Sequence, residues 1–381
     1  MAETTTSASA SGPKDRSQEL APWYTETLTS VPDNVRKVLE TYSHVPAEEV
    51  ESHILSLRER AWSICPYPCI GQFRFLDLSI SIHPYYPNVI SRLLPSSTPG
   101  VPSTRDPANF LDLGCCLGQD FRALAAAGVP VSQLHGAELE PAFIDLGFDL
   151  FRDRDRVPAS RFVTPADIFA ESFFDTPEPG KDASGGRGVF APLLGKMDVI
   201  YAASFFHLFD WEGQLEIARR VIKLMRPVPG SVVLGRQAGN LQAGSQESRM
   251  NEWLNVFKKN EPGKEESKES GNNPVNDEDR DSTTTTETKN QSYKPTNKNR
   301  SSAPYRHNPE SWQNLWSEIG RETGTEWEVH SELIESSARR WNMAKPSGEG
   351  RVDASASGAP NEDKSWLDQG VRMMWFWVIR K

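Results

Sequence analysis

The chain has 381 residues, 37% of them hydrophobic and 25% charged, and its formal net charge is −10. This length and apolar content can bury one good core, whereas the acidic balance argues against a nucleic-acid partner, since phosphate binding needs a basic surface. No run of 18 apolar residues predicts a membrane span, and residues 1–16 lack the apolar segment of a secretory signal. We therefore expect a cytoplasmic protein that acts on a small molecule.

Two amphipathic helices are expected between residues 33 and 63, within a helical cap that we place at residues 21–100 after a disordered N-terminus at residues 1–20. Their apolar residues recur at the i, i+3/i+4, i+7 spacing of a buried helix face. These residues are Val35, Val38, Leu39 and Tyr42 in the first stripe, and Val50, Ile54, Leu57 and Ala61 in the second. The aromatic side chains of the following segment, residues 62–75, could equally belong to the core or cover an apolar ligand.

Residues 110–120, Phe-Leu-Asp-Leu-Gly-Cys-Cys-Leu-Gly-Gln-Asp, are the most informative stretch of the chain. An apolar strand reaches an acid, Asp112, and a turn of small residues then opens a helix, as in folds that bind a nucleotide-like cofactor at the edge of a parallel sheet. The residues of this turn that we expect to shape the cofactor site are Gly114, Cys115, Cys116 and Gly118. The spacing is not G-x-G-x-x-G, so it does not predict a pyrophosphate site.

Two more acids follow at the ends of the next two predicted strands. Glu138, followed by Leu139, could accept hydrogen bonds from both ribose hydroxyls of an adenosine group. Asp167 could bind the adenine amino group, with the backbone N–H of Ile168 facing a ring nitrogen. Any one of these acids could simply cap a helix. Three in order, at the spacing of a helix plus a strand, favour an adenosine site.

The remaining pattern is that of a doubly wound α/β sheet, because strands alternate with helices along the chain. Further strands are predicted at residues 196–201, 230–235, 326–334 and 373–380, and further helices at residues 215–225 and 311–319. After the strand at residues 196–201 comes an aromatic loop, residues 205–209, that contains His207. This loop is where we expect the reacting end of the substrate.

Two polar segments interrupt this pattern. Residues 258–302 contain only Val275 and Tyr293 as apolar residues, and residues 345–364 are a shorter stretch of similar composition. Ordering such a chain costs about 1–2 kcal/mol per residue, which the few apolar groups cannot offset. We predict that both segments are disordered surface insertions without a catalytic role.

The cysteines and histidines do not predict a metal site. Cys65 and Cys69 supply only half of a tetrahedral set, and the seven histidines lack ligand spacing. Four cysteines, two of them adjacent in the turn, also form no disulfide framework. We expect neither a metal nor a structural disulfide.

The acid-x-Gly-x-x-x-Gly turn, with acids after the second and third strands, resembles the class I S-adenosylmethionine-dependent methyltransferases. The resemblance implies S-adenosylmethionine as cofactor, a Rossmann-like core at residues 101–257, and an antiparallel hairpin after a helix within residues 303–381. The chain departs from that pattern at Cys116, where the family commonly has glycine.

Four segments more specifically resemble the methyltransferases of fungal meroterpenoid pathways of the austinol, terretonin and andrastin type. These segments are residues 61–71, 73–78, 111–120 and 205–209. The resemblance implies formation of a methyl ester on a hydrophobic carboxylic acid in secondary-metabolite biosynthesis. Phenolic O-methylation or C-methylation of a polyketide is the alternative among enzymes, and a non-catalytic scaffold that binds S-adenosylmethionine is the alternative outside them. The oligomeric state stays open, a homodimer included.

The acceptor decides whether His207 is needed. A carboxylic acid has a pKa near ~4 and is already the nucleophile at neutral pH, whereas a phenol, with a pKa near ~10, needs a base. His207 is the candidate for that base, and its alternative role is packing within the aromatic loop. No catalytic residue is expected if the acceptor is a carboxylate, because positioning then supplies most of the rate.

Overall fold

The computed structural model describes residues 21, 23–94, 107–174, 188–246, 303–334 and 370–381. The predicted disordered segments at residues 1–20, 258–302 and 345–364 lie outside these ranges.

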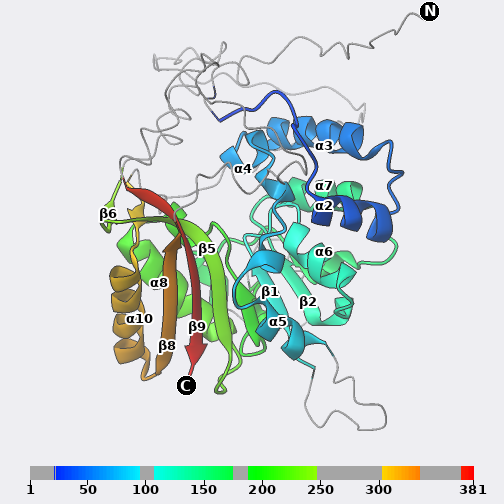
Figure 1. Cartoon of the computed structure of the whole chain (residues 1–381). Helices are drawn as coiled ribbons and strands as arrows, with labels where there is room; N and C mark the ends of the chain where they lie inside the picture. Colours follow the sequence, from blue (N-terminus) through cyan, green and yellow to red (C-terminus); the bar gives the residue numbers. More distant parts are fainter. Residues whose placement is uncertain (1–20, 22, 95–106, 175–187, 247–302, 335–369) are drawn as a thin grey trace, which may run out of the picture.

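A seven-stranded sheet with the order β3-β2-β1-β4-β5-β9-β8 forms the centre of the protein (Figure 1). Its strands are β1 (Phe110–Leu113), β2 (Leu134–Ala137), β3 (Phe162–Val163), β4 (Val199–Tyr201), β5 (Val232–Asn240), β8 (Trp327–Ile334) and β9 (Val371–Arg380). The first five are parallel, and β9 runs antiparallel to both β5 and β8. The predicted doubly wound sheet with an antiparallel C-terminal pair is confirmed. Its strand order reverses between β1 and β4, which is where ligands bind in such sheets.

Helices cover both faces of the sheet because alternate strand residues point to opposite sides. On β1, Phe110 belongs to one apolar core and Leu111 to the other. The first core packs against α5 (Tyr86–Leu93), α6 (Gln119–Ala126), α7 (Pro141–Phe151) and the N-terminal cap. The second packs against α8 (Trp211–Leu224) and α10 (Pro309–Thr323). Both cores are almost fully closed to solvent, so the strand ends are held in fixed positions.

The N-terminal cap contains α2 (Asp33–Lys37), continued by one π-helical turn, η1 (Val38–Tyr42), and then α3 (Val50–Ile64), which packs on α7 (Figure 1). Three short helical turns follow: α4 (Pro68–Gly71), η2 (Arg74–Leu76) and η3 (Ser79–Ile82). The two predicted cap helices are therefore present, whereas the short turns have too few residues to show a period. These turns bring the chain across the carboxyl ends of the strands.

A buried ion pair ties the cap to the core. Arg122 of α6 and Asp153 have fully buried side chains with Nε and Oδ2 3.0 Å apart, and Tyr42 of η1 donates its hydroxyl to the same carboxylate at 2.8 Å. Arg122 also donates to the carbonyl of Leu117 at 3.0 Å. The pair therefore joins η1, α6 and the turn before α6.

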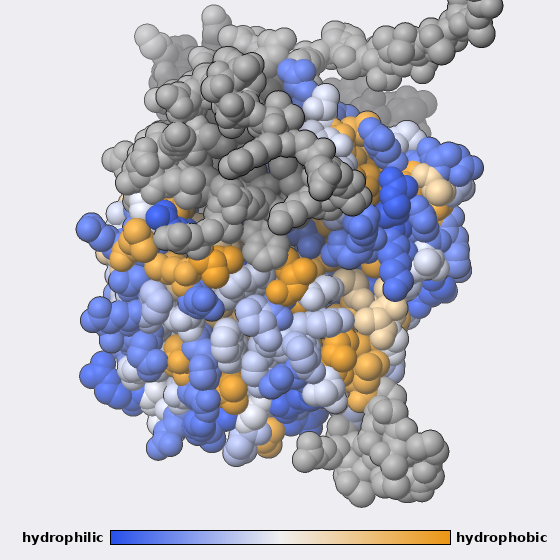
Figure 2. All heavy atoms as spheres, viewed as in Figure 1, coloured by the Kyte–Doolittle hydropathy of each residue, from blue (hydrophilic) through white to orange (hydrophobic). Residues whose placement is uncertain are grey.

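The surface is mostly polar. Figure 2 shows apolar residues in several separate groups between hydrophilic ones on the face that it presents. Among the described residues, the exposed large hydrophobic side chains are those of Ile82, Val228 and Leu241. None of the helices in the described ranges has the length and apolarity needed to cross a bilayer.

Candidate functional site

A cavity of about 330 Å³ opens at the carboxyl ends of the parallel strands. The turns between Tyr67 and Ser79 line one side of it, and residues that follow β1, β2, β3 and β4 line the other. The cavity thus lies at the point where the strand order reverses. In residues 62–75, for which a core and a covering role were equally open, Tyr67 and Phe75 line the cavity, whereas Trp62 and Phe73 belong to the buried core.

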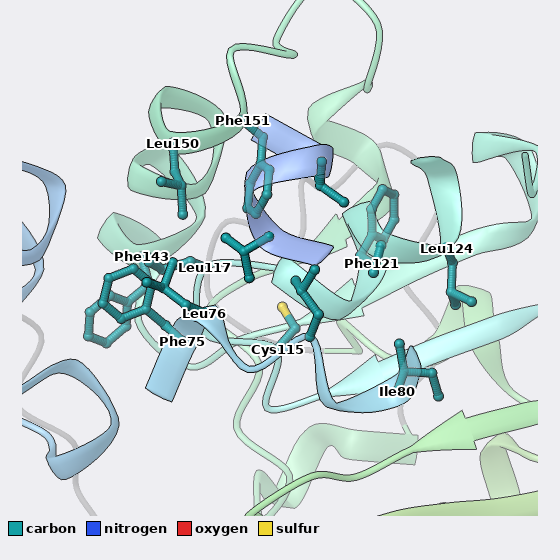
Figure 3. Packing of buried hydrophobic residues seen from close by; sticks show 14 of the residues in the cluster. Phe75, Leu76, Ile80, Cys115, Leu117, Phe121, Leu124, Phe143, Leu150 and Phe151 are labelled. Carbon is teal, nitrogen blue, oxygen red and sulfur yellow. The ribbon is translucent and has the colours of Figure 1, made fainter. Parts of the chain in front are cut away.

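Eight of the ten predicted site residues line this cavity: Asp112, Gly114, Cys116, Glu138, Leu139, Asp167, Ile168 and His207. The other two, Cys115 and Gly118, do not. Cys115 is 1% exposed, and Figure 3 shows its side chain among the apolar residues of the core near Leu117. Gly118 has φ +65° at the start of α6, where a Cβ atom would collide with Arg122. Both residues therefore support the turn on the side that faces the core and do not line the cavity.

The turn after β1 depends on three residues with left-handed backbone conformations, Gly114, Cys116 and the Gly118 already described. Gly114 has φ +75°, and a Cβ atom there would lie 2.6 Å from Cδ2 of Phe205. Cys116 has φ +52°, the conformation that explains why related turns use glycine at this point. Cysteine is nevertheless accommodated: its backbone N–H donates to Oε2 of Glu138 at 2.8 Å, and its thiol contacts that of Cys69.

Glu138 connects this turn with the end of β2. Its carboxylate accepts from the N–H of Cys116 through Oε2, and from the N–H of Glu140 through Oε1 at 3.0 Å. Burial raises the pKa of Glu138 from 4.5 to about 7, against the opposite effect of these backbone donors. A carboxylate has about four acceptor positions, and the backbone groups of Cys116, Glu140 and Leu139 occupy only part of them, so acceptor capacity remains for hydroxyl donors.

This raised pKa makes cofactor binding depend on pH. If the ionised carboxylate accepts the ribose hydroxyls, affinity is present above the pKa and is lost as the pH falls through about 7. We expect the dissociation constant for S-adenosylmethionine to be about tenfold higher at pH 6 than at pH 8, as calorimetry would measure. The Glu138→Gln variant should bind S-adenosylmethionine more weakly. It should also lose the part of the pH dependence that comes from Glu138, so that only the titration of other groups remains. An identical pH profile in the variant would exclude Glu138 from the binding site.

Asp112 is a buried acid with an unused oxygen. Its side chain is 3% exposed, and Oδ2 has no hydrogen-bond partner among the described residues. Burial, with the nearby charges of Asp120 and Glu138, raises its pKa well above the usual range. A cationic donor such as an ammonium group would stabilise the ionised form of this carboxyl group and would meet a free acceptor at Oδ2.

Asp167 and Ile168 lie on the loop after β3. Oδ1 of Asp167 accepts from the N–H of Phe169 at 2.8 Å, which fixes the carboxylate at the edge of the cavity. Ile168 is 4% exposed, and its carbonyl accepts from Arg220 at 2.8 Å. The loop is thus anchored to α8, and both residues face the space where the sequence predicts the adenine ring.

His207 lies in η8 (Phe206–Leu208), after β4. Its Nδ1 accepts from the N–H of Ala238 at 3.4 Å, which leaves the proton on Nε2. Burial, followed by the charges of Arg306 and Arg74, lowers the pKa of His207 well below 6.5. The ring is therefore a neutral hydrogen-bond donor at physiological pH.

Three arginines that the sequence analysis did not select line the same part of the cavity: Arg74, Arg236 and Arg306. Asp77, which has a side chain only 6% exposed, lies 3.9 Å from Arg74 and forms a short ion pair with Arg236. Arg236 belongs to the part of β5 beyond the predicted strand end. An arginine shortly after the apolar residues 232–234 was the available signal for it, whereas nothing local distinguishes Arg74 or Arg306.

No group of three His, Cys, Asp or Glu side chains suited to a metal occurs within the ranges that the structure describes. Cys69 of the C-x-x-x-C motif instead contacts Cys116 of the cofactor turn.

The strand order, with five parallel strands followed by an antiparallel pair, is that of a class I methyltransferase. Comparison with known proteins supports this assignment. Residues 23–76 match the family described as "Meroterpenoid methyltransferase N-terminal domain". The O-methyltransferase phiE of Fungal sp. (strain ATCC 74256) is 36% identical over 314 residues, which cover 82% of this chain and 80% of phiE. The chain therefore belongs to the same family of fungal O-methyltransferases.

Two other relatives match over a shorter part of the chain. The O-methyltransferase atr3 of Stereocaulon alpinum is 40% identical over 58% of this chain and 56% of atr3. The Asnovolin E/Chermesin D methyltransferase nvfJ of Aspergillus novofumigatus is 37% identical over 55% of this chain and 66% of nvfJ. The protein is accordingly a methyltransferase that uses S-adenosylmethionine, in a family whose members serve fungal meroterpenoid biosynthesis.

Solved structures resemble the chain only distantly. Mitomycin 7-O-methyltransferase MmcR is 14% identical with a TM-score of 0.36, covering 96% of this chain and 70% of its own. Geranyl diphosphate methyltransferase is 11% identical with a TM-score of 0.39, covering 82% and 80%. The strand order β3-β2-β1-β4-β5-β9-β8 itself shows the class I fold.

Proposed function

We propose that this methyltransferase forms the methyl ester of a hydrophobic carboxylic acid in fungal secondary metabolism. The observation that carries the proposal is the state of His207. It is the one imidazole among the described cavity residues, it is neutral, and its Nδ1 already accepts a backbone N–H. Because neither ring nitrogen of His207 is free to accept a proton, its state suits an acceptor that is ionised before it binds.

We place the cofactor against the strand-end acids. In this proposal, the unused Oδ2 of Asp112 receives the ammonium group, the free acceptor positions of Glu138 receive the ribose hydroxyls, and Asp167 with Ile168 contacts adenine. Gly114 and Cys116 let the backbone approach the methionine half. S-adenosylmethionine, when bound, supplies an electrophilic methyl group on a cationic sulfur. Its positive charge also suits a wall that carries several acids.

We call the part of the cavity beyond the cofactor site, toward η8 and β5, the acceptor side. Its residues position the substrate and exclude water. Apolar side chains dominate this part of the cavity, and they include Phe75, Phe205, Leu208 and Phe209. Such a lining suits an apolar acid with few polar groups. Holding the reacting atoms in line can supply about 7–11 kcal/mol of the barrier, so no proton transfer is required of the protein.

The test uses an acceptor that has both carboxylate and phenolic oxygens. We would incubate the enzyme with S-adenosylmethionine carrying a deuterated methyl group and a panel of aromatic and terpenoid acids and phenols, including 2,4-dihydroxy-6-methylbenzoic acid. Mild alkaline hydrolysis should release labelled methanol, because an ester is cleaved under conditions that leave an aryl ether or a C-methyl group intact. An alkali-stable product would contradict ester formation and favour the phenolic or C-methyl alternative.

Mutation of His207 provides the matched kinetic prediction. With S-adenosylmethionine saturating at each pH, His207→Ala should lower turnover less than about tenfold, because the ring contributes packing and one hydrogen bond, and the rate should stay nearly flat between about pH 6 and 8. Loss of a true general base would cost about 10²- to 10⁴-fold. A loss of that size, with S-adenosylmethionine affinity unchanged, would assign base catalysis to His207. Absence of turnover with all acceptors, despite cofactor binding, would favour the scaffold alternative.

A further inference from the structure

The acceptor side of the cavity carries more positive than negative charge. Arg74, Arg236 and Arg306 line it, and Asp77 is the acid that contacts the first two. The acids of the cofactor site come from β1, β2 and the loop after β3, whereas Arg236 is on β5 and Arg306 lies beside η8, after β4. The acids of the cofactor site therefore lie on one side of the strand-order reversal and the guanidinium groups of Arg236 and Arg306 on the other, where Asp77 is paired with Arg236.

Arg306 differs from the other two arginines because it has no acidic partner among the described residues. Its recorded hydrogen bond goes from Nη1 to the carbonyl of His207, which accounts for one of its five N–H donors. Burial lowers the pKa of Arg306 to about 10, and no nearby acid offsets this effect. Arg306 is half-buried, and a guanidinium that is partly removed from water without a counter-ion is destabilising, so a bound carboxylate would offset that cost.

The backbone around Arg306 is held in place. Arg306 pairs with Gly244 between β7 (Tyr305–Arg306) and β6 (Gly244–Ser245), and the N–H of Tyr305 donates to the carbonyl of Phe209 at 2.9 Å. The guanidinium is therefore fixed beside η8, next to His207, whose Nε2 carries the proton. A planar fork of donors at a fixed position suits a carboxylate better than a single hydroxyl.

We propose that Arg306 binds the carboxylate of the methyl acceptor and selects acids over neutral analogues. This inference rests on the proposed ester formation and adds the residue that recognises the acid. Arg236 lines the same site and is held in place by its ion pair with Asp77. Its buried Nε has no partner among the described residues.

Binding of a matched pair of probes tests the assignment. We would measure by calorimetry the affinity of 2,4-dihydroxy-6-methylbenzoate and of its neutral primary amide, in the presence of S-adenosylhomocysteine to prevent turnover. The wild-type protein should prefer the acid at least about tenfold, as expected for charge-assisted hydrogen bonds. Arg306→Met should reduce the preference to within about twofold. Arg306→Lys should retain part of it, since lysine keeps the charge without the fork.

Arg161→Met is the matched control, because Arg161 donates to the carbonyl of Ser132 and does not line the cavity. It should keep the full preference, and S-adenosylhomocysteine affinity should stay within about twofold in every variant. If Arg306→Met does not fold, as its lost cofactor binding would show, Arg306→Lys decides by the same ratio.

Three results would overturn the inference: no preference for the acid in the wild type, an unchanged preference in the Arg306 variants, or weakened S-adenosylhomocysteine binding with the preference retained. The last result would place the cofactor's own carboxylate on Arg306. Failure of the proposed function has a different signature, an alkali-stable methylated product. An ester product with an unchanged acid preference in Arg306→Met would refute the role of Arg306 alone.

Discussion

Replacing Asp153 with alanine is expected to lower the free energy of unfolding by about 3–5 kcal/mol. The substitution removes the only carboxylate that pairs with Arg122 in the described structure and leaves a fully buried guanidinium without its counter-ion. The aromatic rings around Arg122, among them Phe148 and Phe162, cannot replace two charge-assisted hydrogen bonds. Urea denaturation at pH 7 would measure the change.

Two controls separate the buried pair from ordinary contacts. Asp145 pairs with Arg154 at the same distance, 3.0 Å, but both side chains are more than half exposed, so Asp145→Ala should cost less than about 1 kcal/mol. Tyr42→Phe removes only the hydroxyl donor to Asp153 and should cost about 1 kcal/mol. Equal effects of Asp153→Ala and Asp145→Ala would show that the cap and the core are not coupled through Arg122.

Periodicity and turn chemistry were sufficient to predict the sheet. Each predicted strand is present, because buried parallel strands read as short apolar runs between turn residues. The predicted starts of the helices were less accurate than the predicted strands. Helix α8 begins at Trp211, before the predicted apolar stripe, since Asp210 caps it by accepting from the N–H of Gly213 at 2.9 Å. A capping side chain is visible in the sequence, but apolar spacing alone does not include it.

The cofactor half of the site was also predictable, because it follows one rule: acids placed after successive parallel strands meet at one edge of the sheet. Asp112, Glu138 and Asp167 meet in one cavity for this reason. The prediction was less accurate within the turn, because it gave all four of the selected turn residues the same role in the cofactor site. Cys115 points into the core, and the left-handed φ of Cys116 turns its side chain toward the cavity.

The acceptor half could not be predicted, because no local pattern links its members. Arg74 comes from a three-residue turn, Arg236 from a strand that continues to Asn240 by pairing with β9, and Arg306 from a two-residue strand. These residues meet only through tertiary contacts. No sequence pattern indicates that Nδ1 of His207 accepts a hydrogen bond from the N–H of Ala238. This contact decides which ring nitrogen of His207 carries the proton.

Gly114→Ala is expected to lower turnover by about 100-fold or more and to weaken S-adenosylmethionine binding at least about tenfold. The new Cβ would lie 2.6 Å from Cδ2 of Phe205, so the ring must move within the cavity or the turn must shift away from it. Displacements of about 1 Å at a reacting site cost on the order of 10²-fold in rate. Calorimetry and turnover at saturating cofactor would measure the two effects.

Gly195→Ala is the matched control. Gly195 also has a positive φ, +67°, but a Cβ atom there would meet nothing within 4 Å. Both variants should lose about 1 kcal/mol of stability from backbone strain, whereas only Gly114→Ala should lose cofactor affinity. Similar cofactor affinities in the two variants would show that Phe205 adjusts without disturbing the site.

The double variant Gly114→Ala/Phe205→Ala distinguishes steric collision from backbone strain. Removing the ring leaves the positive φ at position 114 unchanged but eliminates the atom that the new Cβ would meet. Cofactor affinity should then recover to within about threefold of the Phe205→Ala single variant, although turnover stays low because the ring also lines the acceptor side. Affinity that does not recover would mean that the turn itself needs glycine for its backbone conformation, independently of its contact with the loop after β4.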